Sequence, residues 1–174
     1  MKPFFSVATL SALVVASTSA FAANQGETST VMFKGAIKEN TCILNNDSVA
    51  QVVELGDVES SVLASTGLAS QPTSFTISLD QCDSATASIT FSGDTATDEA
   101  LRVTGGETVA SGVGIQILEN GIPLKVDGST SSAFKPVGTG KDNKFNFAAR
   151  YIALGEKVSP GQANATAQFT VKYE

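Results

Sequence analysis

The chain has 174 residues, a formal net charge of −6, no His, no Trp and two Cys. The lack of His excludes Ser-His-Asp and Cys-His catalytic arrangements and His-ligated metal sites, and two Cys cannot build a four-cysteine zinc site. The acidic balance argues against nucleic acid as a partner, because phosphates attract basic surfaces. Binding and structural roles remain as the main functional classes.

The first 22 residues have the features of a secretory signal peptide. Lys2 supplies a positive start, residues 4–16 form a largely apolar run, and residues 20–22 (Ala-Phe-Ala) have the small-x-small pattern of a cleavage site. An apolar run of this length is too short to anchor the chain across a bilayer. We therefore expect residues 1–22 to be removed on export. A buried N-terminal core helix is the alternative.

Export would place the chain in an oxidising compartment, where cysteines of a small domain usually pair. Cys42 and Cys82 are the only cysteines, so the sequence predicts one disulfide between them. Two free thiols are the alternative. No later apolar run is long enough to span a bilayer, and the rest of the chain has the length of one domain.

Alternating apolar and polar residues dominate the rest of the chain, which is the period of a strand with one buried face. Clusters of Gly, Asn, Asp and Ser separate these runs and predict turns. One short helical turn is expected within residues 57–69, and no other segment has a sustained helical period. The pattern predicts an all-β sandwich. In chain order, the alternating runs are residues 75–79, 89–91, 115–117, 145–151 and 163–173.

The two ends of the exported chain are unusual for a closed sandwich. The chain ends on its longest alternating run, with Phe169, Val171 and Tyr173 on one face. At the other end, a polar stretch over residues 23–30 precedes the alternating Val31 and Phe33. Terminal strands of a sandwich are normally tied into its sheets, and a simply disordered tail is the alternative for residues 23–30.

Motifs for catalysis and metal binding fail on inspection. Residues 138–141 (Gly-Thr-Gly-Lys) lack the first glycine and the final Ser or Thr of a phosphate-binding loop, so they predict a hairpin turn. Asp94, Asp98 and Glu99 lack the regular spacing of calcium loops and predict a solvated turn. We predict no catalytic residue, no metal site and no cofactor, and we expect no small-molecule substrate.

Several short stretches, in their order and spacing, resemble the pilins of the bacterial chaperone–usher pathway. The resemblance is closest to the major structural subunits of type 1-like fimbriae and covers essentially all of residues 23–174. At the C-terminus it rests on the penultimate Tyr173 and on Gly161, fourteenth from the end. The other stretches are residues 31–35 (Val-Met-Phe-Lys-Gly) with Cys42 soon after, 81–82 (Gln-Cys), 112–118 (Gly-Val-Gly-Ile-Gln-Ile-Leu) and 147–151 (Phe-Ala-Ala-Arg-Tyr).

The resemblance implies an incomplete immunoglobulin-like sandwich that lacks its last strand and is completed by donor-strand exchange. A missing strand leaves an apolar groove flanked by unpaired backbone groups, which an added strand can fill. In the family a periplasmic chaperone fills the groove first. At the outer-membrane usher, the N-terminal extension of the next subunit then replaces the chaperone. Head-to-tail repetition would build a fimbria on the cell surface.

The resemblance also implies a role for each segment. It divides the chain into a signal peptide (1–22), a donor-strand extension (23–35) and a pilin domain (36–174). Counting back from Phe33 by twos predicts the inward-facing donor residues, which are Glu27, Ser29, Val31 and Phe33. The strand at the groove edge, which the chaperone would bind together with the terminal carboxylate, is represented by Gly161, Ala167, Phe169, Val171, Tyr173 and Glu174.

One position departs from the family pattern. Donor strands of the family usually carry Gly where this chain has Ser29, and Gly26 has the opposite parity. Either the groove has room for a hydroxymethyl group at this point or the register differs.

The sequence therefore predicts a structural fimbrial subunit that supports cell adhesion. A secreted monomeric immunoglobulin-like binding module of the adhesin type is the alternative. Tip adhesins of the pathway carry an additional binding domain, for which the exported chain leaves no room. A secreted hydrolase would need a nucleophile and a base, and no such pair is visible. A minor adaptor or terminator subunit would share the features of a shaft subunit.

Overall fold

The computed structural model describes residues 27–35, 42–83 and 85–174. The chain divides into two units, residues 1–37 and residues 38–174. In the first unit, the described residues 27–35 belong to no strand or helix, and the side chains of Val31, Met32 and Phe33 are 71%, 75% and 91% exposed. Among the described residues, no helix has the length and apolar character needed to cross a membrane.

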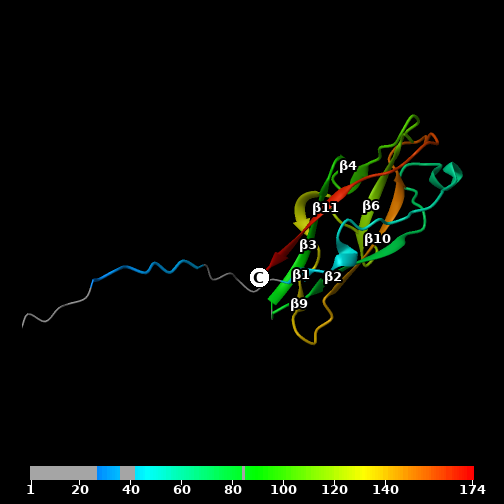
Figure 1. Ribbon diagram of the computed structural model, residues 1–174. Coiled ribbons are helices and arrows are strands. Elements are labelled where there is room, and N and C mark those ends of the chain that lie inside the picture. Colours follow the sequence, from blue (N-terminus) through cyan, green and yellow to red (C-terminus); the bar gives the residue numbers. More distant parts are fainter. Residues whose placement is uncertain (1–26, 36–41, 84) are drawn as a thin grey trace, which may run out of the picture. The chain divides into compact units, whose positions relative to one another are not determined.

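The second unit is built of two antiparallel sheets (Figure 1). In the larger sheet the strand order is β1 (Ile43–Leu44), β2 (Thr73–Asp80), β10 (Lys144–Ala153), β6 (Val113–Glu119), β5 (Ala100–Arg102) and β4 (Thr95–Thr97), and β7 (Ile122–Pro123) pairs with β6. In the smaller sheet the order is β11 (Ala167–Tyr173), β3 (Ala85–Gly93) and β8 (Asp127–Ser131), and β9 (Lys135–Val137) also pairs with β3. Two short 3₁₀ turns are η1 (Asn46–Ser48) and η2 (Ser60–Leu63).

Apolar side chains from the two sheets meet in one core. Ile77 on β2 and Ile89 on β3 are 1% and 0% exposed. The ring of Phe91 on β3 meets the ring of Phe147 on β10 edge to face, with centroids 5.0 Å apart, which is a favourable aromatic geometry. The predicted alternating runs from residue 75 to residue 151 therefore lie in β2, β3, β6 and β10, as expected of a sandwich.

Strand β6 differs from the alternating pattern predicted for it. Every residue from Val113 to Leu118 is buried, because β6 lies centrally in its sheet between β10 and β5. The polar Gln116 is only 7% exposed, and its Oε1 accepts hydrogen bonds from Nε and Nη2 of Arg150 at 3.1 and 2.9 Å. A buried amide oxygen is thus satisfied by a neighbouring cation, which offsets the cost of its desolvation.

The predicted turns are present, with one correction. Asp98 and Glu99 form the exposed turn between β4 and β5, as expected. Residues 138–141 also form a turn, in which the Lys141 N–H donates to the Gly138 carbonyl at 3.1 Å. The hairpin expected there is wrong, because β9 belongs to the smaller sheet and β10 to the larger one. The turn carries the chain from one sheet to the other.

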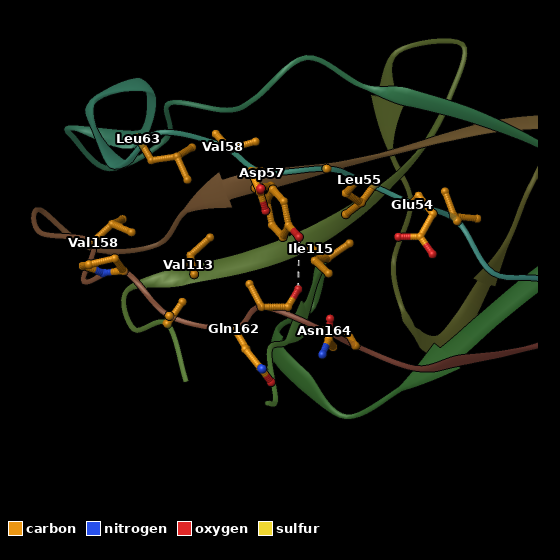
Figure 2. A pocket seen from close by; sticks show the side chains of 18 of the residues that line it. Glu54, Leu55, Asp57, Val58, Leu63, Val113, Ile115, Val158, Gln162 and Asn164 are labelled. Atoms are coloured by element: carbon orange, nitrogen blue, oxygen red, sulfur yellow. Dashed lines mark hydrogen bonds between the residues drawn. The ribbon is translucent and has the colours of Figure 1, made fainter. Parts of the chain in front are cut away.

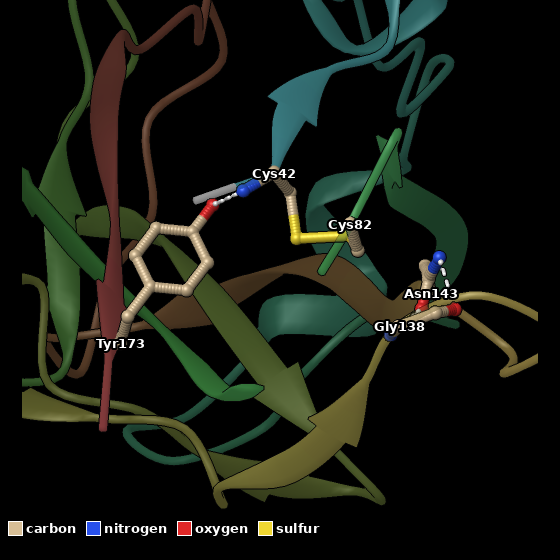
Figure 3. Close-up of a disulfide and its surroundings, with 5 residues drawn as sticks. All are labelled: Cys42, Cys82, Gly138, Asn143 and Tyr173. Atoms are coloured by element: carbon tan, nitrogen blue, oxygen red, sulfur yellow. Dashed lines mark hydrogen bonds between the residues drawn. A yellow bond between two sulfur atoms is a disulfide. The ribbon is translucent and has the colours of Figure 1, made fainter. Parts of the chain in front are cut away.

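The disulfide that the sequence predicts joins Cys42 to Cys82, just beyond the end of β2 (Figure 3). The Cys42 N–H donates to the hydroxyl oxygen of Tyr173 at 3.2 Å. The bond ties the end of β11 to the disulfide. In the same view the Asn143 side chain caps the turn between β9 and β10, accepting from the Gly138 N–H at 2.9 Å.

Candidate functional site: an open groove beside the last strand

The last strand lies at an open edge of the smaller sheet. β11 pairs with β3 in one unbroken register, from Ala167 opposite Gly93 to Tyr173 opposite Ala87. Its other side pairs with no strand of the described residues. In Figure 1 β11 is the red arrow beside β3. Sheet edges of this kind present unpaired N–H and C=O groups to other chains.

The register shows which backbone groups of β11 face outward. The residues Glu174 and Thr86 exchange both backbone hydrogen bonds, at 2.8 and 3.0 Å, so they are a hydrogen-bonded pair. Hydrogen-bonded and non-hydrogen-bonded pairs alternate along an antiparallel ladder. The residues whose N–H and C=O groups point away from β3 are therefore Ala167, Phe169, Val171 and Tyr173.

The same four residues turn their side chains toward the core. They are half-buried, whereas Gln168, Thr170 and Lys172 between them are exposed. Half-buried apolar side chains on an open edge mean that one side of the core lacks a covering strand. The structure thus brings four of the predicted groove-edge residues together on one edge, with Glu174 immediately after them.

A groove runs between this edge and the extended segment 49–58. It consists of two adjoining cavities of about 820 and 710 Å³. The first, in which Figure 2 labels Val158 and Gln162, also reaches Gly161. The second extends to Leu44 and Phe169. The residues that line both cavities are Gln51, Val53, Leu55, Ile115, Ala165, Thr166 and Ala167.

The opposite wall of the groove is the segment 49–58, which was not predicted from the sequence. Val53 and Leu55 are half-buried and line both cavities, whereas Glu54 between them is exposed and Val52 before them is 76% exposed. This period-two signal was present in the sequence, but only over a few residues. The backbone of residues 50–58 makes no hydrogen bond with the backbone of other described residues. Both walls therefore carry backbone groups without a ladder partner.

The chain upstream of β11 is held by a different segment. Gln162 pairs with Thr108 and Ala110 through backbone bonds of 2.8 and 2.9 Å, and Asn164 pairs with Thr104 at 2.9 and 2.6 Å. The expected strand over residues 163–173 is therefore wrong at its start, because β11 begins only at Ala167. The backbone of these upstream residues leaves the β3 ladder to pair with residues 104–111.

Gly161 lies where two backbones approach closely. A Cβ atom at this position would lie 2.6 Å from the Ala110 nitrogen and 2.6 Å from the Val109 carbonyl carbon. No side chain fits at that distance, so glycine is required for the pairing between residues 159–164 and residues 104–111. Gly161 thus shapes the end of the groove through its backbone.

Burial affects the hydroxyl pKa of two tyrosines: Tyr151, which lines the first cavity, and Tyr173, the last residue of β11. Burial raises the pKa of the Tyr151 hydroxyl above its ordinary value of 10.0, and the nearby carboxylates of Asp57 and Glu54 add to this effect. Burial also raises the pKa of Tyr173, against the opposing effect of the hydrogen bond from Cys42. Both hydroxyls are therefore protonated at neutral pH.

The donor residues predicted from the sequence lie in the first unit. Glu27, Ser29, Val31 and Phe33 fall within the described residues 27–35 and are all exposed. The signal peptide and residues 23–26 lie outside the described residues. In the parts of the chain that the structure describes, no three Cys, Asp or Glu side chains gather as a metal site would require.

Comparison with known proteins gives one consistent family. A family model described as Fimbrial protein matches residues 31–174. The fimbrial subunit type 1 of Salmonella typhimurium is 36% identical, with 100% of both chains covered. The S-fimbrial protein subunit of Escherichia coli O6:K15:H31 is 40% identical, with 98% of both chains covered.

The fold agrees with solved structures. The rod subunit of the P pilus has a TM-score of 0.63 at 23% identity, covering 76% of this chain and 99% of its own. A type I fimbria protein of Burkholderia pseudomallei has a TM-score of 0.53 at 33% identity, covering 76% of this chain and 88% of its own. The predicted all-β, immunoglobulin-like architecture is confirmed. The chain belongs to the fimbrial protein family and is a structural subunit of a fimbria rather than an enzyme.

Proposed function

We propose that the chain polymerises by donor-strand exchange, with residues 23–35 of one copy filling the groove of the next. The observation that carries this proposal is the open edge of β11, where Phe169 and Val171 are half-buried and their backbone groups face away from β3. A strand placed there would gain backbone hydrogen bonds from the edge and bury its alternate side chains in the groove.

The N-terminal segment has the character of such a strand. Val31 and Phe33 are 71% and 91% exposed, and their positions have the same parity. Large apolar side chains so exposed favour burial against a partner. With Phe33 pointing into the groove, Val31, Ser29 and Glu27 point the same way. Each copy then carries one groove and one donor segment, and this head-to-tail contact does not close on itself, so it builds a filament.

As a fimbrial subunit, the chain assembles with other subunits into an extracellular fibre. On its way there we propose that it passes through the periplasm, after removal of residues 1–22. A periplasmic chaperone would hold the groove until the donor strand arrives at the outer-membrane usher. An uncovered edge as long as β11 would otherwise pair with strands of other chains and aggregate. The chaperone would contact Ala167, Phe169, Val171 and Tyr173 and bind the terminal carboxylate of Glu174.

Substitutions in the donor segment test this function. Replacing Val31 and Phe33 together by Asp should abolish fibre formation, because two carboxylates would have to enter an apolar groove. Met32→Asp is the matched control, since Met32 is 75% exposed and has the opposite parity. We expect it to assemble as the unaltered chain does, measured by electron microscopy and sedimentation.

The difference in fibre formation between the double variant and Met32→Asp tests the proposal. Fibres formed by the chain with both Asp substitutions would refute the proposed role of the donor segment. Loss of assembly in Met32→Asp as complete as in the double variant would refute the assigned parity.

A further inference from the structure

One hydrogen bond lies within the lining of the groove, near Gly161. The Tyr151 hydroxyl, on β10, donates to the carbonyl oxygen of Ala163 at 3.2 Å, the dashed line in Figure 2. Tyr151 belongs to the larger sheet, whereas Ala163 lies in the stretch that leads into β11. Both residues line the same cavity. The bond therefore links β10, which also lines the groove, to the stretch along which an added strand would extend beyond β11.

The carbonyl of Ala163 lies in the stretch that continues the open edge of β11 toward residue 161. An added strand that runs beyond β11 would pair with this stretch. The backbone groups of Gln162 and Asn164 pair with residues 104–111, away from the groove. In an extended chain the residue between them points its backbone groups the opposite way, into the groove. Ala163 has the same parity as Ala167 and Phe169. A strand that pairs beyond Ala165 thus meets a carbonyl that already accepts a hydrogen bond.

Two hydrogen bonds with Ser70 hold the backbone of Tyr151 in place, so only its side chain is free to rotate. The Tyr151 N–H donates to the hydroxyl oxygen of Ser70 at 3.0 Å, and the Ser70 N–H donates to the Tyr151 carbonyl at 3.0 Å. Its raised hydroxyl pKa keeps the donor proton in place at neutral pH. Opening the groove at this point therefore requires a rotation of the Tyr151 side chain, not a shift of β10.

We propose that Tyr151 gates strand uptake: its hydrogen bond to Ala163 closes the Gly161 end of the groove, and an added strand pairs past Ala165 only after that bond breaks. This inference rests on the proposed function, with the N-terminal segment of a second copy as the entering strand. It makes Tyr151 a residue that sets how fast the groove fills.

The test compares Tyr151→Phe with a control variant that loses a hydroxyl outside the groove. Tyr151→Phe keeps the ring and removes the bond. The control, Thr76→Val, removes the 3.0 Å hydrogen bond from the Thr76 hydroxyl to Oδ1 of Asn146, and Thr76 lines neither cavity. A fluorescent peptide of residues 23–35 is added in excess, and its uptake is followed by anisotropy. We expect Tyr151→Phe to take up the peptide about two- to tenfold faster than the unaltered chain, the factor that one net hydrogen bond represents. Thr76→Val should match the unaltered chain.

The possible outcomes separate the gate from the proposed function. Uptake that is unchanged or slower in Tyr151→Phe, or equally accelerated in Thr76→Val, would overturn the gate and leave donor-strand exchange standing. No uptake by any of the three chains would overturn the proposed function and the gate with it. A second readout is hydrogen exchange in chains with residues 23–35 appended after Glu174. There the Ala163 and Ala165 amides should exchange more slowly in Tyr151→Phe, and equal exchange would also overturn the gate.

Discussion

Appending residues 23–35 after Glu174 through a flexible linker is expected to convert the chain into a stable monomer. β11 ends at Tyr173, so a linker there lets the appended strand fold back antiparallel along the open edge. Burial of Val31 and Phe33 contributes about 1.5–3 kcal/mol each to the free energy of unfolding. The urea midpoint should rise by about 1 M or more relative to the unmodified chain.

The unmodified chain should unfold at lower urea and associate as its concentration increases, because its edge and apolar groove remain open. The matched control carries the same appended segment with Val31 and Phe33 replaced by Asp. That chain has the same length and linker but cannot fill the groove with apolar side chains. Equal midpoints for the two appended chains, together with a stable monomeric unmodified chain, would show that the groove needs no strand.

Loss of the disulfide is the second large effect we expect. Replacing Cys42 and Cys82 together by Ser removes a cross-link between residues 40 apart. By the chain-entropy model such a loop contributes about 4 kcal/mol to the free energy of unfolding. The effect should reach the groove, because the Cys42 N–H is the partner of the Tyr173 hydroxyl at the end of β11.

Urea unfolding of the strand-appended chain, with and without the two Ser substitutions, measures this contribution. Reduction of the strand-appended chain that keeps both cysteines, by dithiothreitol, is the control and should lower its midpoint to that of the Ser variant. The Ser variant should itself be insensitive to the reductant. A difference below about 1 kcal/mol between the oxidised chain and the Ser variant would refute the assigned role of the disulfide.

The parts of the fold with long alternating patterns were predictable from the sequence. β2, β3 and β10 have apolar residues at every second position because one face of each packs in the core. The unusual C-terminal run also led directly to β11, whose half-buried face follows the predicted parity. The family resemblance then indicated that a strand of another chain pairs with that open edge.

The remaining features depend on contacts between distant segments. β11 begins at Ala167 rather than at residue 163 because Asn164 pairs with Thr104, sixty positions away. The turn at residues 138–141 joins two sheets. Its residues suit a hairpin turn equally well, so the local sequence does not distinguish the two. The Tyr151 contact with Ala163 likewise arises only when β10 faces the stretch before β11. Short-range patterns contain no information on such pairings.

The groove wall formed by residues 49–58 was only partly predictable from the sequence. Its alternation at Val53 and Leu55 is visible in the sequence but too short to predict a strand. Its lack of a ladder is explained if its partner belongs to another copy. The helical turn expected within residues 57–69 is confirmed as η2, and it covers only Ser60–Leu63.

A density map of the assembled fibre, resolved to side chains, tests donor-strand exchange in this chain most directly. We expect residues 23–35 of a neighbouring copy as an extended strand along the open edge of β11 and the stretch before it, with Val31 and Phe33 inside the groove and Met32 pointing outward. A fibre in which the outer edge of β11 stays open, or pairs with any other segment, would contradict that assignment.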